Sequence, residues 1–317
     1  MLRDTLAVLG RQGRWVLLAG LVLGVGVPQM GAVLLPAIAP LIGLTLFVAA
    51  LRVGPQAVRP GPGGAVAALW PVAALQLALP LAVGGLLALA GWLDTPTGNA
   101  IVLMLAAAPI TGVPGLAVMT GADAGLALRQ LVLGTALLPL TALPVFLLLP
   151  VFPDLEAVAA GALRLLLVIG LATGGALALR HAAPGLAHPR NAAALDGVMA
   201  LSMAVAVTAL MGALGPALAR GAWAPVAWLL ALSFALNLGG ALGTWALARR
   251  ALPRHAAAAL AIVAGNRNMA LFLAAMPPET AAPLMLFVGC YQIPMYLTPL
   301  TLPRLLGPLT RPTPDPE

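Results

Sequence analysis

Long apolar runs follow one another along the chain, separated by short segments with arginine, aspartate, proline or glycine. A membrane-spanning helix needs about 20 apolar residues. Cutting the sequence at its charges and Pro/Gly clusters leaves ten runs of roughly that length, at 14–29, 31–51, 64–92, 99–121, 124–150, 156–179, 192–214, 223–248, 256–276 and 281–306. The division at 27–32 is the weakest. The pattern predicts an all-α membrane protein with about ten transmembrane helices.

The composition supports a helical membrane protein. The 317 residues are 62% hydrophobic and 8% charged, whereas soluble domains carry about a quarter charged residues. Alanine, leucine, glycine and proline dominate and aromatic residues are few, which is typical of helical spans and not of barrel strands. The N-terminal run has no small-residue cleavage site, so we expect a retained first helix. The one cysteine, Cys290, can form no intramolecular disulfide.

The distribution of charge predicts the orientation. The net charge of +7 comes from arginines scattered singly between apolar runs, which indicates membrane topology and not nucleic-acid binding. With the N-terminus inside, the cytoplasmic segments hold thirteen arginines: Arg3, Arg11, Arg14, Arg52, Arg59, Arg129, Arg180, Arg190, Arg249, Arg250, Arg254, Arg304 and Arg311. The opposite side holds one, Arg220, together with Asp94, Asp154, Glu156 and Glu279. We expect both termini in the cytoplasm. The lysine-free, alanine-rich composition suggests a bacterial inner-membrane protein.

Ten helices can be divided into two repeats of five. Because five is odd, the two repeats would have opposite orientations in the membrane, which is a common transporter plan. The first repeat would cover 1–150 and the second 151–310, followed by a disordered tail at 311–317. The fourth helix of each repeat is interrupted near mid-membrane, at Ala108–Gly115 and at Gly265–Asn268. Paired interruptions of this kind indicate a substrate site. We therefore expect helices 4 and 9 to be broken and to cross.

The second interruption contains Arg267, between Asn266 and Asn268, in the middle of an apolar run. A guanidinium near the membrane midplane costs several kcal/mol, and such a residue marks a functional site by default. Its rigid fork of donors suits a carboxylate or phosphate-like group. The alternative is a structural arginine bonded to carbonyls that the breaks set free.

Five segments together resemble the bile acid:sodium symporter family in its ten-helix bacterial form: Pro40–Arg52, Ala74–Pro80, Ala108–Pro109, Ala122–Leu128 and Gly265–Asn268. The resemblance covers nearly the whole chain. It implies alternating-access transport of an organic anion, with cations held by oxygen ligands at the two breaks. The site residues that it implies, with the breaks themselves, are Gln76, Thr111, Gly112, Pro114, Gly115, Thr135, Gly265, Asn266, Arg267, Asn268 and Gln292.

Several of these positions depart from the sodium-binding pattern of that family. Val263 or Ala264 stands where the family carries a glutamate, and Arg267 stands where it carries a glutamine. Pro114-Gly115 corresponds to its Ser-Asn pair. A sodium site is therefore doubtful, and we expect no other metal and no cofactor. Our hypothesis is that Arg267 replaces the sodium ion or contacts the carboxylate of the substrate.

Other readings of the chain stay open. The spans contain no Asp–Glu pair, no histidine and no serine arrangement that could form a catalytic set, so we expect no enzyme. A non-transporting membrane sensor or structural protein, or a carrier of the auxin-efflux-like type, would show the same pattern. Asn237 and Gln292 also fit interhelical hydrogen bonds. The expected partners are a small organic anion and the lipid bilayer, with no nucleic acid. The sequence leaves the substrate and the oligomeric state open.

Overall fold

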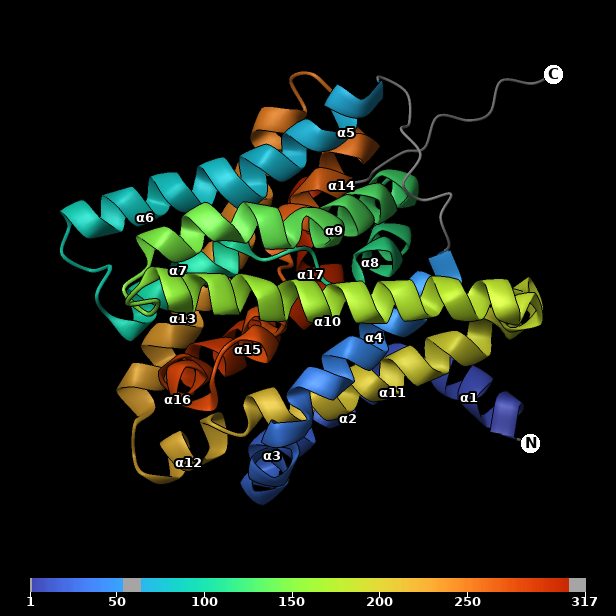
Figure 1. Cartoon of the computed structure of the whole chain (residues 1–317), viewed down its shortest axis with the longest axis horizontal. Helices are drawn as coiled ribbons and strands as arrows, with labels where there is room; N and C mark the ends of the chain where they lie inside the picture. The colour runs from blue at the N-terminus through green and yellow to red at the C-terminus, as the bar shows by residue number, and fades with distance from the viewer. Residues whose placement is uncertain (1, 54–63, 308–317) are drawn as a thin grey trace.

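The computed structural model describes residues 2–53 and 64–307 (Figure 1). In these ranges the regular structure is helical, with short 3₁₀ and π segments and no β-strand. The predicted tail at 311–317 lies outside the described residues, as do Arg59 and Arg311. The all-α prediction is confirmed for the part that the structure describes.

Among the described residues, seven helical segments are long and apolar enough to cross a membrane. They are Pro28–Val53 (α3 Pro28–Leu34 and α4 Ile38–Val53), Gly64–Leu89 (α5 Gly64–Ala73, π-helix η3 Ala74–Ala78 and α6 Leu79–Leu89), α9 Ala124–Leu148, α10 Leu155–Ala182, Pro189–Ala219 (α11 Ala192–Met211 and α12 Leu214–Ala219), α13 Trp223–Ala248, and Pro278–Leu306 (α16 Pro278–Ala281 and α17 Met285–Leu306). The chain is that of a multi-pass membrane protein.

The predicted number of ten spans is not confirmed as such. The N-terminal pair α1 (Leu2–Arg11) and α2 (Gly13–Gly26) is bent by 82° and would make an eighth span. The predicted spans 99–121 and 256–276 are each divided into two short helices. Their first halves, Pro96–Ala106 and Arg254–Gly265, are apolar but too short to cross alone.

The outer faces of the long helices expose large apolar side chains. Leu89 on α6, Leu140 on α9, Leu171 on α10 and Trp228 on α13 are all exposed. Such a surface would be a liability in water and is the ordinary lipid-facing surface of a transmembrane helix.

Side-chain caps fix where several helices begin. The Asp154 carboxylate accepts a hydrogen bond from the backbone N–H of Ala157 at 2.7 Å, and α10 starts there. The Asp123 carboxylate accepts from Leu126 N–H at 2.9 Å at the start of α9. Both carboxylates satisfy an open donor and face the positive end of a helix dipole. The polar residues that separate the apolar runs therefore also set the helix boundaries.

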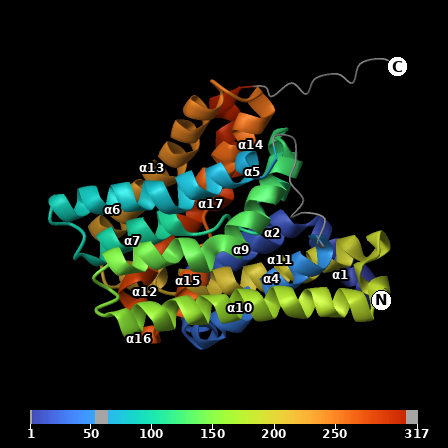
Figure 2. The ribbon, with the colours of Figure 1, turned by 45° about the horizontal axis from the view of Figure 1, so that its top comes forward.

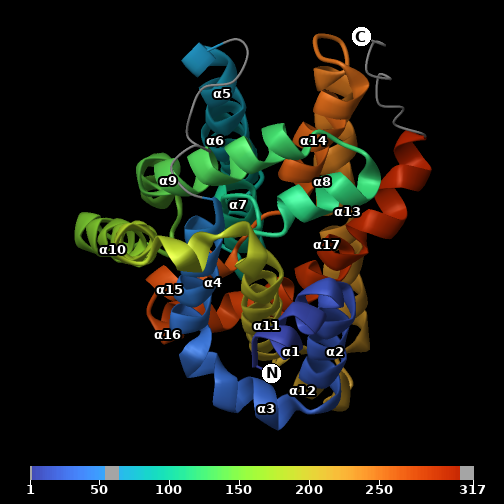
Figure 3. The same ribbon diagram turned by 90° about the vertical axis from the view of Figure 1, so that its right-hand side faces the viewer.

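The helices pack in two groups, each built from both halves of the sequence. In the first group α11 packs against α1, α2, α3 and α4, and α10 packs against α4. Figure 2 shows α10 beside α4. In the second group α9 packs against α5, α6, α8 and α14, and α13 packs against α14 and α17. Figure 3 shows α1, α2 and α3 at the bottom of the view and the α13–α14 connection at the top. The groups meet where α10 contacts α9 and α15 (Ala270–Ala275), α4 contacts α15, and α11 contacts α17.

Glycine permits the closest approach within the first group. A Cβ on Gly20 of α2 would lie 2.5 Å from the carbonyl oxygen of Ala204 on α11. The Thr208 hydroxyl of α11 donates to the Gly20 carbonyl at 3.0 Å. Small residues at helix contacts and hydroxyl bonds between helices are typical of packing in lipid, where apolar burial alone does not drive association.

Candidate substrate site at two interrupted helices

The interruptions divide two helices at the centre of the molecule. α7 (Pro96–Ala106) stops, residues 107–112 are not helical, and α8 (Val113–Thr120) follows. α14 (Arg254–Gly265) stops in the same way, and α15 begins at Ala270. Pro109 lacks the N–H that a continuing helix would need, and Asn266 has the non-helical backbone of a cap. The two interruptions that the sequence predicts are therefore present.

The two breaks pair with each other through their backbones. The N–H of Ile110 donates to the carbonyl of Asn266 at 3.0 Å, and the N–H of Asn268 donates to the carbonyl of Ala108 at 2.7 Å. Pro109 and Arg267 form an antiparallel bridge between these bonds. Extended backbone at membrane depth survives only where its polar groups have partners. Each break supplies the partners of the other.

The Arg267 side chain is buried in this crossing, with 2% of its surface exposed. Its Nε donates to the carbonyl of Ala264 at 3.1 Å, its Nη1 to that of Ala107 at 3.0 Å and its Nη2 to that of Leu75 at 3.3 Å. The guanidinium thus connects α14, the end of α7 and the π-helix η3. These bonds match the structural role that the sequence left open beside the functional one.

The Leu75 carbonyl is open because of the π-helix and a proline. The N–H of Leu79 bonds to the carbonyl of Ala74, five residues back, and not to Leu75. The next donor in that pattern would come from residue 80, which is Pro80 and has no N–H. Leu75 therefore presents a carbonyl without a helical partner, and Arg267 takes it.

Arg267 lies at the C-terminal ends of two helices. α7 and α14 both finish here, and their last carbonyls carry partial negative charge. Among the described residues, no carboxylate pairs with the guanidinium. Carbonyl dipoles hold the positive charge without neutralising it. An anion placed beside Arg267 would complete the charge balance.

Side chains from α13 and α17 fix the end of α14. The Gly265 carbonyl accepts from Tyr291 Oη at 2.6 Å and also from the amide nitrogen of Asn237. The Asn266 amide donates to Ile262 at 2.8 Å, and its oxygen accepts from the Thr298 hydroxyl at 2.9 Å. Asn237 makes the interhelical bond that the sequence offered as one of its readings.

A small cavity of about 40 Å³ lies beside the crossing. Its polar lining comes from Thr45, Thr111, Arg267, Asn268 and Gln292, and Met203, Met269, Met295 and Tyr296 contribute larger side chains. The volume suffices for one or a few water molecules and is too small for an organic anion. The cavity lies between α4 and α11 of the first group and the breaks and α17 of the second, so movement of the groups apart would enlarge it.

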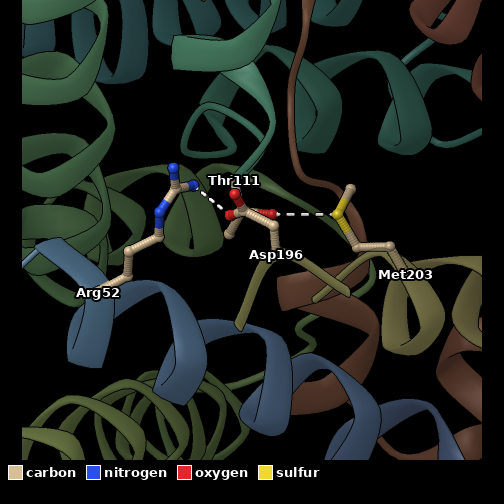
Figure 4. Close-up of polar contacts among 4 residues, drawn as sticks. All are labelled: Arg52, Thr111, Asp196 and Met203. Atoms are coloured by element: carbon tan, nitrogen blue, oxygen red, sulfur yellow. Dashed lines mark hydrogen bonds and ion pairs between the residues drawn. The ribbon is translucent and has the colours of Figure 1, made fainter. Parts of the chain in front are cut away.

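Figure 4 draws two polar contacts, one between the two helix groups and one within the first group. The Thr111 hydroxyl, in the first break, contacts the sulfur of Met203 on α11 at 3.5 Å and so joins the two groups. Arg52 at the end of α4 forms an ion pair with Asp196 near the start of α11. That pair ties helices within the first group and does not touch the cavity lining.

The structure gathers only part of the predicted set around the cavity. Thr111, Arg267, Asn268 and Gln292 line it. The others do not line it: Gly265, Asn266, Gln76 and Thr135 are buried elsewhere, Gly112 caps α8, and Pro114 and Gly115 lie in the first turn of α8. Gln76 donates to the Gly134 carbonyl at 3.1 Å, and Gln292 donates to Val288 within its own helix at 3.3 Å.

Sequence reasoning missed several contributors. Thr45, Met203 and Tyr296 also line the cavity, and no break or charge next to them in the sequence distinguishes them. The Leu75 carbonyl was also missed, although Pro80 five residues later was a readable signal. Among the described residues, no group of three His, Cys, Asp or Glu could hold a metal ion.

In comparisons with known proteins, the chain matches no family model and no curated protein. The proposal that follows therefore rests on the geometry of this site.

Proposed function

We propose that the protein is a secondary transporter that carries a small organic anion across the bacterial cytoplasmic membrane by alternating access. The observation that carries the proposal is the backbone bridge between two interrupted helices, Pro109 with Arg267. Interrupted helices that cross near mid-membrane are a recurring way to build transport sites, because their freed polar groups face a cavity. We further propose ten spans in two inverted repeats, 1–150 and 151–310, with both termini cytoplasmic.

The choice of an anion rests on Arg267. Its charge is buried and has no carboxylate partner among the described residues. A guanidinium has five N–H donors, and three carbonyls are bonded to its three nitrogens. Because Arg267 also lines the cavity, a small carboxylate there would meet a positive charge in a low-dielectric setting, where the attraction is strongest.

The proposed independence from sodium rests on the same three carbonyls. Carbonyl oxygens that converge on one point are ligands for hard cations. Here the oxygens of Leu75, Ala107 and Ala264 converge on the guanidinium. We propose that Arg267 takes the place of a coupling cation in a divergent relative of the bile acid:sodium symporters.

Transport by purified protein in liposomes tests this function. Radiolabelled small mono- and dicarboxylates would be offered to the full chain with sodium or with choline as the external cation. We expect uptake that is equal in the two salts and is lost in Arg267→Met. Uptake that requires sodium would refute the replacement of the cation. Absence of uptake for every anion would favour the non-transporting alternative.

A further inference from the structure

A second cluster of polar side chains lies at the end of the molecule where α13 turns into α14. It consists of Trp245, Arg249, Arg250 and Arg254, and we call it the Trp245 cluster. Figure 3 shows this turn at the top of the view, close to the end of α17. The Arg254 guanidinium donates to the Leu306 carbonyl of α17 at 2.9 Å, which fixes the two ends together.

Two arginines face one indole in this cluster. The guanidinium carbon of Arg249 lies 4.3 Å from the centre of the Trp245 ring, and that of Arg254 lies 6.0 Å away. Both distances fall within the range of cation–π attraction. A stacked guanidinium keeps its N–H groups in the plane of the fork, where they can bind oxygen atoms of a phosphate. The ring thus pre-orders two phosphate-binding groups at one point.

Within the described part of the chain, the Trp245 cluster has a hydrogen-bond donor without an acceptor and positive charges without paired carboxylates. The indole N–H of Trp245 is buried and has no acceptor among the described residues. No acidic residue occurs in the sequence between Asp196 and Glu279. The backbone N–H of Asp123 donates to the His255 carbonyl, and the carboxylate of Asp123 caps α9. Arg249, Arg250 and Arg254 are exposed, and among the described residues no carboxylate forms an ion pair with them.

We propose that the Trp245 cluster binds the phosphate headgroup of an anionic phospholipid. Tryptophan is enriched at the level of lipid headgroups, and basic pockets between helix ends bind anionic lipids on the cytoplasmic side. The predicted topology puts the α13–α14 turn on that side. The exposed leucine of the same helix end, Leu247, gives the acyl chains an apolar surface next to the charges. This site is separate from the cavity at Arg267 and does not depend on the proposed transport.

Lipid-dependent stabilisation of the purified full chain tests the site. Cys290 is buried, so its reaction with a thiol-reactive fluorophore during heating reports unfolding. We expect phosphatidylglycerol to raise the midpoint and phosphatidylcholine to leave it unchanged. Glycerol 3-phosphate, which has the phosphate without acyl chains, should have no effect at the same concentration.

Substitution locates the binding. Each arginine near an anionic membrane surface contributes about fivefold in affinity, so in Arg249→Gln with Arg254→Gln the phosphatidylglycerol concentration that gives half of the stabilisation should rise roughly twenty-five-fold. The charge-matched control is Arg3→Gln with Arg190→Gln, since both of these arginines are exposed elsewhere, and it should keep the full effect. Equal effects of the two phospholipids, equal losses in both double variants, or a full response to glycerol 3-phosphate would each overturn the proposal.

Discussion

At the scale of single residues, Arg267 shows how a buried charge is stabilised without a carboxylate partner in the described part of the chain. Three carbonyls, two of them at helix ends, bond its three nitrogens. The carbonyl of Leu75 is available only because Pro80 has no N–H to offer it. The arginine therefore has two roles that are compatible: it holds the crossing together, and it leaves a net positive charge on the cavity wall.

Replacement of Arg267 by methionine should destabilise the protein strongly. Methionine fills a similar volume but leaves the carbonyls of Leu75, Ala107 and Ala264 without these donors, at about 1–3 kcal/mol for each buried group that stays unsatisfied. We expect the Cys290 labelling midpoint to fall well below that of the wild type. Arg164→Met is the matched control, because Arg164 is an exposed arginine on a spanning helix, and its effect should stay within about 0.5 kcal/mol. Equal midpoints for the two variants would contradict the structural role.

The Gly265 carbonyl gives a second prediction, because it accepts from both Tyr291 and Asn237. Tyr291→Phe and Asn237→Leu should each cost about 0.6–1.5 kcal/mol, the range of interhelical and buried hydrogen bonds. The double variant should cost more than the sum, because only then is the carbonyl left without either donor. A double-mutant cycle on thermal stability measures this coupling. Strict additivity would show that the two bonds do not share one acceptor.

At the scale of elements, the crossing is held by close contact between α9 and the π-helix. A Cβ on Gly134 would overlap Gln76 Oε1 and would lie 3.0 Å from Pro109 Cδ. Glycine is therefore required where α9 passes both the π-helix and the first break. The Thr135 hydroxyl next to it is buried and has no hydrogen-bond partner among the described residues.

Gly134→Ala should consequently disturb the crossing of the two breaks. Overpacking of this kind costs about 1–3 kcal/mol, and displacement of Gln76 and Pro109 should reduce anion uptake as well as stability. Gly85→Ala is the control, since a Cβ there has open space; it should be neutral or stabilising by about 0.5–1 kcal/mol. Uptake and labelling midpoints of both variants would be compared. Wild-type behaviour of Gly134→Ala would show that the contact can relax.

At the scale of the whole molecule, the cavity lies between two helix groups, and its volume of about 40 Å³ excludes an organic anion in this arrangement. The proposed transport would then require the groups to move relative to each other, as in carriers built from repeats. The Thr111–Met203 contact crosses this boundary at 3.5 Å.

A reversible crosslink across that boundary should stop transport. The variant carries Thr111→Cys and Met203→Cys, with Cys290→Ala to remove the native thiol. We expect a short disulfide-forming crosslinker to abolish uptake and a reductant to restore it, because the groups can no longer separate. The two single-cysteine variants, treated with the same reagent, control for simple labelling. Undiminished uptake by crosslinked protein would contradict movement at this boundary.

The sequence by itself determined the local properties of this protein. Apolar runs of spanning length, the helix boundaries at Asp123 and Asp154, the breaks near Pro109 and Asn266, and the isolated charge of Arg267 all depend on a few neighbouring residues. A short stretch of sequence is enough to predict these features, because every helix that crosses the bilayer needs a similar length and a mainly apolar sequence.

Only the tertiary structure decided what those features contact. Arg267 bonds to Ala107 and Leu75, which are 160 and 192 residues away in the sequence. The cavity includes Thr45, Met203 and Tyr296, which no local pattern distinguishes, and it leaves Pro114 and Gly115 outside. Every residue has a backbone carbonyl, so residue type does not show which carbonyls bond to Arg267 or which residues line the cavity. The packing of the helices determines both.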